Sequence, residues 1–167
     1  IAAPGSDGAT VINNIIVDNG LRLQVGGGTA GGQPGNLRFD ANSSSNNTLD
    51  YNLFYLNSGS VQIIWGAASY TTLAAFQGAV AGQEIHGLQA DPFFIAPALV
   101  AQRPASAPFN VAVNVGDYHL NFGSPAIDSA NSDAPNEPTL DIEGNARVDD
   151  PFITDSGAGA RTYDDRG

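Results

Sequence analysis

The sequence predicts an all-β protein whose short strands stack as a parallel β-helix, a single-stranded solenoid with long loops. Three observations predict this fold. Charged residues are only 14% of the 167 residues and glycine is abundant, at 20 residues, which suits a chain with many tight turns. The apolar runs are short, and they end at Asn or Gly. One theme also repeats: an Asn, an apolar strand and an Asn/Gly turn begin at Asn14 and again at Asn52, 38 residues later.

In such a solenoid no coil buries its apolar face alone, so the core comes from stacking one coil on the next. Asn side chains at stacked turns can bond to one another along the stack. That gives Asn13, Asn14 and Asn52 a structural role. A β-sandwich made from the same short strands is the alternative on pattern alone.

The first two thirds of the chain alternate apolar strands with turns rich in Asn, Gly and Ser. We expect strands at residues 11–17, 21–25, 37–39, 49–56, 61–65 and 111–115. The spacing of Leu73, Phe76 and Val80 predicts one short helix near residues 70–81, with Ser69 or Thr71 as its N-cap. Hairpin turn signals are few, so most strands should pair with those of other coils.

The composition of the chain changes at residues 117–131, from short apolar runs before them to acidic, turn-rich sequence after them. An aromatic strand, a Gly-Ser-Pro turn and a short apolar return follow one another there, which predicts the closing coil of the solenoid. Tyr118, Leu120 and Ile127 should point inward from it. Residues 132–167 then form an acidic, loop-rich C-terminal segment.

Length and composition limit what the protein can be. Residues 1–167 are most simply one domain. Six arginines and no lysine stand against 17 acidic residues, and the net charge of −11 argues against nucleic-acid binding. No cysteine is present for disulfide or thiol chemistry, and no apolar run is long enough for a membrane span. Because the chain opens at Ile1 without a charged leader, we expect a fragment or a processed end of a larger protein.

Several short motifs follow one another along nearly the whole chain: Asn13-Asn14-Ile15-Ile16, Asp50-Tyr51-Asn52-Leu53-Phe54-Tyr55, Ala90-Asp91-Pro92-Phe93-Phe94, Asp117-Tyr118-His119-Leu120 and Gly123-Ser124-Pro125-Ala126-Ile127-Asp128. Their order resembles the C-terminal part of secreted bacterial right-handed parallel β-helix proteins of the "choice-of-anchor Q" type. Residues 141–147 look like the acidic turn that precedes the last strand in that group.

This resemblance implies a right-handed, pectate-lyase-like coil and an extracellular or cell-surface location. Members of the group are often parts of larger proteins that bind or cleave polysaccharides. In the group the Asp165-Arg166-Gly167 stretch usually runs on into a short aromatic strand, and further coils precede the chain. The resemblance therefore also implies a truncated or processed end of a solenoid.

Catalytic residues are not predicted for this segment. Most glycosidases need two positioned carboxyl groups, one of them kept protonated, whereas adjacent acids in loops are usually solvated. Lyases of the β-helix type need a basic residue and a neutraliser for the uronate carboxylate. With no lysine present, Arg22 and Arg38 are the remaining bases, and no acidic cluster is secured beside them by spacing. The two histidines, His86 and His119, are too far apart in sequence to indicate a zinc site.

Two kinds of binding site are predicted instead. Hard oxygen ligands gather in the acidic C-terminal segment around Gly144, which suits a structural Ca²⁺ ion better than a transition metal. The proposed ligands are Asp141, Glu143, Asn145, Asp149, Asp150 and Asp155. Aromatic side chains could stack on sugar rings, although strand aromatics are more often core residues. The proposed stacking residues are Tyr51, Tyr55, Tyr70 and Tyr163.

The function that these observations favour is a non-catalytic extracellular β-helix module that binds carbohydrate or forms a cell-surface scaffold. Two alternatives stay open. In the first, the chain would be the C-terminal portion of a polysaccharide lyase or glycosidase. In the second, it would be a self-assembling subunit of an extracellular filament or surface layer. Self-assembly would use exposed strand edges, which pair readily with another chain and build open filaments when the contact does not close.

Overall fold

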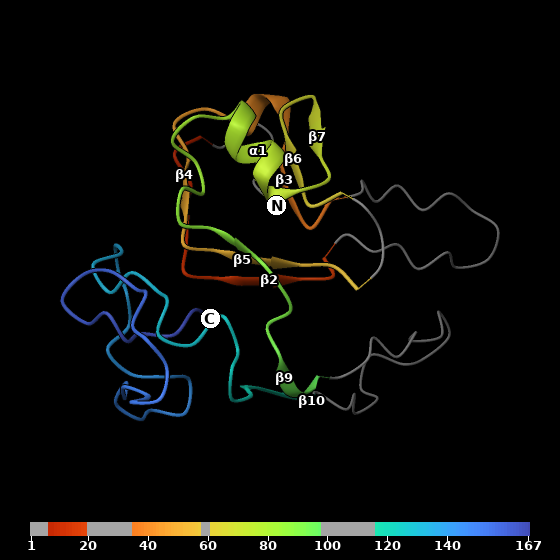
Figure 1. Cartoon of the computed structure of the whole chain (residues 1–167). Helices are drawn as coiled ribbons and strands as arrows, with labels where there is room; N and C mark the ends of the chain where they lie inside the picture. The colour runs from red at the N-terminus through yellow and green to blue at the C-terminus, as the bar shows by residue number, and fades with distance from the viewer. Residues whose placement is uncertain (1–6, 20–34, 58–60, 98–115) are drawn as a thin grey trace, which may run out of the picture.

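The computed structural model describes residues 7–19, 35–57, 61–97 and 116–167, and it is mostly β with one short α-helix (Figure 1). The expected strands at residues 21–25 and 111–115 lie outside the described residues. The strands are β1 (Thr10–Ile12), β2 (Ile15–Val17), β3 (Leu37–Phe39), β4 (Thr48–Asp50), β5 (Leu53–Tyr55), β6 (Ile63–Trp65), β7 (Ala68–Tyr70), β8 (Leu88–Gln89), β9 (Phe94–Pro97) and β10 (Gly116–Leu120), with a 3-10 turn η1 (Ala41–Ser43) and the helix α1 (Leu73–Ala79).

Parallel pairing between strands far apart in sequence dominates the described residues. β1 pairs with β4, β2 with β5, and β3 with β6, all parallel, and β8 adds to the other edge of β5. Thr10 lies opposite Thr48 and Ile15 opposite Leu53, so the predicted 38-residue repeat is confirmed by the register. We call β1, β2 and β3 the first layer and β4, β5 and β6 the second layer.

Each layer turns a corner where the sequence suggested one continuous strand. The run at residues 11–17 bends at Asn13, whose φ is 63°, and the run at 49–56 bends at Tyr51, whose φ is 55°. Both values lie in the left-handed region, which Asn tolerates and an aromatic residue rarely adopts. The prediction of two unbroken strands is therefore wrong, because a left-handed residue at the same point of each layer ends one strand and starts the next.

The amide of Asn52 fills the second of these corners. Its side chain is fully buried, and its Oδ1 accepts from both the backbone N–H and the Nδ2 of Asn14, at 3.0 Å each. Its Nδ2 donates to the carbonyl of Val11 and to Glu84 Oε1. All four hydrogen-bonding positions of the amide are used, which confirms a structural role for the stacked Asn pair.

The core lies inside the layers and under the helix. In Figure 1, β4 is at the left, β2 and β5 run below, and β3 and β6 close the right side, with α1 above. Side chains from both layers and from α1 meet there, and Trp65 and Tyr70 pack against them at the rim. The core residues are Ile16, Phe39, Leu49, Phe54, Ile63, Leu73 and Phe76.

The predicted helix is confirmed as α1, but its N-cap differs from the prediction. Thr72 caps it, and its hydroxyl accepts from the backbone N–H of Ala75. Ser69 instead belongs to β7, which pairs antiparallel with β6 around Gly66, at φ 63°. This hairpin was not expected, because Gly66-Ala67 followed by an apparent helical spacing hid the short return strand.

Replacing the cap gives a first testable result. Thr72→Ala removes the side-chain acceptor for one orphan N–H of a two-turn helix, so we expect a loss of about 1 kcal/mol in the free energy of unfolding. Urea denaturation measures it. Thr71→Ala, one residue earlier and also exposed, is the matched control and should change stability by less than about half as much.

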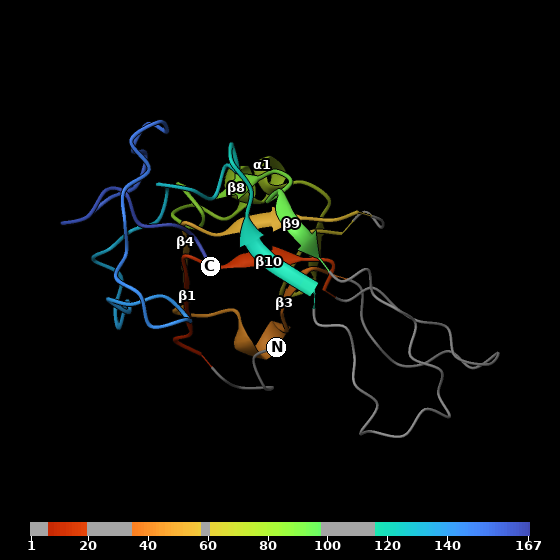
Figure 2. The same cartoon turned by 90° about the horizontal axis from the view of Figure 1, so that it is seen from below.

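The predicted closing coil is wrong in its pairing and in one of its inward residues. β10 pairs antiparallel with β9, and in Figure 1 this pair lies below β2 and β5 rather than within a layer; Figure 2 shows it from below. Tyr118 is 52% exposed and packs edge-on against Phe94, whereas Leu120 and Ile127 are half-buried. The register of the pair shifts between Asp117 and Leu120, the stretch that contains Tyr118.

The C-terminal segment folds back onto the first layer with little regular structure. The backbone N–H groups of Asn131 and Gly167 donate to Asn13, the first to its side chain and the second to its carbonyl. Two isolated bridges, one of them between Asn131 and Ala158, are its only β pairing among the described residues. No helix in the described part of the chain has the length and apolar character to cross a membrane.

Candidate functional site

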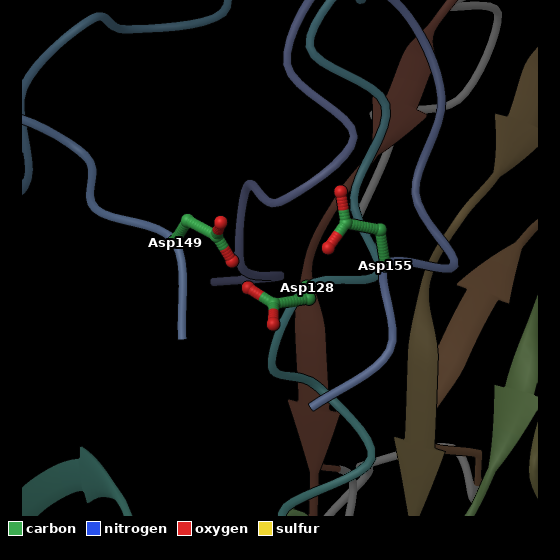
Figure 3. Close-up of side chains that lie close together, drawn as sticks. All are labelled: Asp128, Asp149 and Asp155. Carbon is green, nitrogen blue, oxygen red and sulfur yellow. The ribbon is translucent and has the colours of Figure 1, made fainter. Parts of the chain in front are cut away.

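Three carboxylates converge where the C-terminal segment meets the return after β10. Asp128, Asp149 and Asp155 each contribute an oxygen, and these oxygens all lie within 4.8 Å of one another. Figure 3 shows the three side chains pointing toward one common space from three separate stretches of chain. Asp149 and Asp155 are exposed, whereas Asp128 is fully buried.

The backbone of Asp128 is held rigidly. Its N–H donates to Asp165 Oδ1 at 2.8 Å, and its carbonyl accepts from the N–H groups of Ser156 and Gly157, at 2.7 and 3.0 Å. Its φ of 49° is left-handed, a conformation that Asp adopts more easily than most residues. These bonds fix the direction in which the carboxylate points.

Among the residues that the structure describes, none donates a hydrogen bond to the carboxylate of Asp128. Neither of its oxygens is in contact with solvent or with a donor. Burial, followed by the negative charge of Asp165, raises its pKa to about 6. The backbone amide of Asp150 offsets part of this shift but does not reach the geometry of a hydrogen bond to either oxygen. An unpaired buried carboxylate among other acids is costly, so the cluster favours a cation.

Of the six predicted calcium ligands, the structure brings only two into this cluster, Asp149 and Asp155. Asp141 instead closes its own turn: its carboxylate accepts from the backbone N–H groups of Glu143 and Asn145 and from Asn145 Nδ2. These bonds, first among them the one from the Asn145 backbone, lower the pKa of Asp141. Gly144, at φ 87°, makes the tight turn, as expected.

Two predicted ligands remain. Asp150 accepts from the backbone N–H of Phe152, and the Glu143 carboxylate lies 3.3 Å from His119 Nε2, so neither joins the cluster. The sequence missed Asp128, because it precedes Asp149 by 21 residues and joins the cluster only through the fold. One signal was available. Asp128 ends the Gly-Ser-Pro-Ala-Ile-Asp motif, and its position directly after an apolar stretch indicates that its side chain could be buried.

The four proposed stacking tyrosines do not form one surface. Tyr51 is buried, with its ring stacked on His86 at 4.5 Å between centroids and the Arg166 guanidinium 5.6 Å above it. Tyr70 packs edge-on against the core residue Phe76. The other two, Tyr55 and Tyr163, are half-buried.

A buried polar junction surrounds Tyr51 and was not predicted. Arg166 is 4% exposed, and its guanidinium donates to the backbone carbonyls of Ser129, Asn52 and His86. Burial lowers the pKa of Arg166 to about 10. Burial also raises the pKa of Glu84 to about 7, although its hydrogen bonds with Asn52 act in the opposite direction. The junction joins both layers to the C-terminal segment.

Asp50 and His86 form a carboxylate–imidazole pair of the kind found in acid–base sites. Asp50 Oδ2 lies 2.9 Å from His86 Nδ1 and orients an imidazole whose side chain is half exposed. A carboxylate-held imidazole can act as a general base toward a substrate group within reach. Among the described residues, however, no hydroxyl group is hydrogen-bonded to His86 Nε2. Asp117 binds His119 in a similar way, and this hydrogen bond raises the pKa of His119.

Comparison of the chain with protein-family models, with curated proteins and with solved structures finds no match.

Proposed function

We propose that the chain is a non-catalytic extracellular module, built as a short right-handed parallel β-helix, that serves as a cell-surface scaffold. The observation that supports it most is the unpaired edge of the first layer. β1, β2 and β3 are each the terminal strand of their sheet, and all three pair on the same side, with the second layer. Within the described residues no strand pairs with their outer side.

The outward groups of this edge can be named from the hydrogen bonds. Leu53 N–H donates to the Asn14 carbonyl, and Asp18 N–H donates to the Tyr55 carbonyl. Backbone groups alternate in direction along a strand, so Ile16 also faces β5, while Val17 presents its N–H and carbonyl outward. An edge of this kind accepts another β-helix coil, from a neighbouring module or a second copy.

Solution association tests the scaffold proposal. We expect the 167-residue chain to self-associate with rising concentration, as measured by sedimentation velocity. Val17→Pro removes one outward donor and no bond to β5, so it should weaken association by about tenfold. Its thermal unfolding must match the unmodified chain, which verifies the fold. A chain that stays monomeric up to about 100 µM, or a variant that associates equally well, contradicts the proposal.

Carbohydrate binding is the second candidate, and exposed aromatics at the β9–β10 hairpin favour it. Phe93, Tyr118 and Phe122 are 50%, 52% and 72% exposed, and the Asn121 N–H donates to the Phe93 carbonyl, which brings the ends of this set together. Affinity electrophoresis in gels containing plant or algal polysaccharide separates the two candidates. Retardation that Phe122→Ala abolishes would support binding, and unchanged mobility would exclude it.

A further inference from the structure

The buried carboxylate of Asp128 points to a ligand that the scaffold proposal does not involve. It is fully buried, both of its oxygens lack a donor, and it faces two further carboxylates. A buried carboxylate is normally paired with a cationic side chain, a set of N–H donors or a metal ion. The described residues supply neither of the first two at this point.

The nearby arginines bond to other groups, and of their buried nitrogen atoms only the Nε of Arg147 has no partner among the described residues. Arg161 pairs with Asp164, through Nε at 2.8 Å and Nη2 at 2.6 Å. Arg147 donates to Glu137 and to the Asp165 carbonyl, and Arg166 donates to backbone carbonyls. None of the three contacts the carboxylates of the cluster, so their mutual repulsion is not relieved by a basic side chain of the described residues.

The donor set identifies the type of cation. All three ligands are carboxylate oxygens, with no His nitrogen or Cys sulfur, which selects a hard ion such as Ca²⁺ over Zn²⁺. Every pair of these oxygens lies within 4.8 Å, the span across an ion whose ligands sit at about 2.4 Å on opposite sides. Asp149 and Asp155 are exposed, which leaves room for water to complete the coordination.

We propose that Asp128, Asp149 and Asp155 bind one Ca²⁺ ion that ties the return after β10 to two stretches of the C-terminal segment. The need for such a tie follows from how this segment is held. Its large apolar side chains Ile142, Val148 and Phe152 are 102%, 78% and 85% exposed, so hydrophobic burial contributes little there. Binding a metal to the folded state alone stabilises a segment that lacks an apolar core.

Calorimetric titration of the chelator-treated chain with CaCl₂ tests the site. We expect one ion per chain with a dissociation constant of about 10⁻⁴ to 10⁻³ M, the range of extracellular calcium modules, and weaker binding of MgCl₂. Asp149→Asn and Asp155→Asn should each weaken binding by at least about tenfold. Asp141→Asn is the matched control, since it makes the same charge change in the same segment, and it should leave the affinity within about twofold.

A second readout separates ion binding from a merely structural role. Asp128→Asn removes a buried charge, so its melting temperature should exceed that of the unmodified chain in chelator. In saturating CaCl₂ the order should reverse, because only the unmodified chain gains from the ion. Hydrogen exchange at the Ser156 and Gly157 amides, which bond the Asp128 carbonyl, should slow with CaCl₂ only in the unmodified chain.

Three outcomes would overturn the site. The first is no binding up to about 10 mM CaCl₂, which is ten times the weakest expected dissociation constant. The second is loss of binding in Asp141→Asn but not in Asp149→Asn. The third is that the difference in melting temperature between Asp128→Asn and the unmodified chain keeps its sign when CaCl₂ is added. Calcium binding does not depend on the strand edge, so these results leave the association experiment to be judged separately.

Discussion

Asn52→Ala is expected to destabilise the protein by about 3–5 kcal/mol, a large part of the total stability of a domain of this size. The substitution removes the bonds that the amide makes to the Asn14 N–H, the Val11 carbonyl and Glu84 Oε1. Each buried polar group that loses its only partner costs about 1–3 kcal/mol. Urea denaturation followed by circular dichroism measures the loss.

The matched control for this result is Asn14→Ala. Asn14 is exposed, and its side chain donates to the same Asn52 amide and to the Ile12 carbonyl. Water can replace both bonds, so we expect a loss of about 1 kcal/mol or less. Equal losses for the two variants would show that the buried amide does not hold the corner.

Glu84 is expected to make stability fall as the pH rises. Its carboxyl has a pKa of about 7 in the folded chain against an ordinary 4.5, because burial disfavours the charged form. The folded state therefore binds more protons than the unfolded state between these values, and the free energy of unfolding decreases across this window. The pKa shift corresponds to about 3 kcal/mol of unfolding free energy. This stability is lost as the pH rises from about 4.5 to 7, and the loss stays constant above about pH 7.

Glu84→Gln isolates this contribution. The amide can still accept from Asn52 Nδ2 but does not titrate, so the difference in unfolding free energy between the variant and the unmodified chain should grow as the pH rises. The charged neighbours of Glu84, namely Asp50 and Arg166, together with His86, are retained in both proteins. Glu143→Gln, which removes an exposed carboxylate, is the control. A difference that is constant with pH would remove Glu84 as the cause.

The repeat and the helix could be predicted from local sequence, because each rests on spacing along the chain. Asn14 and Asn52 mark the same corner in two layers, and Leu73 and Phe76 lie on one face of α1. The corners themselves could not be predicted. An apolar run through Asn13 reads as one strand, and a tyrosine at a left-handed φ, as at Tyr51, contradicts ordinary preference.

For the candidate site, the sequence predicts the chemical class of the ligands but not which acidic residues come together. An excess of hard oxygen ligands in residues 132–167 indicated calcium, and Asp149 and Asp155 do lie together. Which acids meet depends on the path of the backbone, and Asp128 enters through bonds to Ser156 and Asp165 that no spacing encodes. Asp141 was a sound candidate by composition, but local amide donors satisfy its carboxylate within the turn.

The contact between Asn13 and Asn131 has a kinetic consequence. These residues are 118 positions apart, and Arg166 meets Asn52 across 114 positions, so the bonds that attach the C-terminal segment have high contact order. Closing such long loops costs entropy before any contact compensates for it, and folding is correspondingly slow. The paired layers can form as soon as residue 65 is available, whereas the contact between Asn13 and Asn131 waits for 66 further residues of synthesis (residues 66–131). During that interval Asn13 is open to other nascent chains together with the rest of the outer edge, so misassembly would begin there.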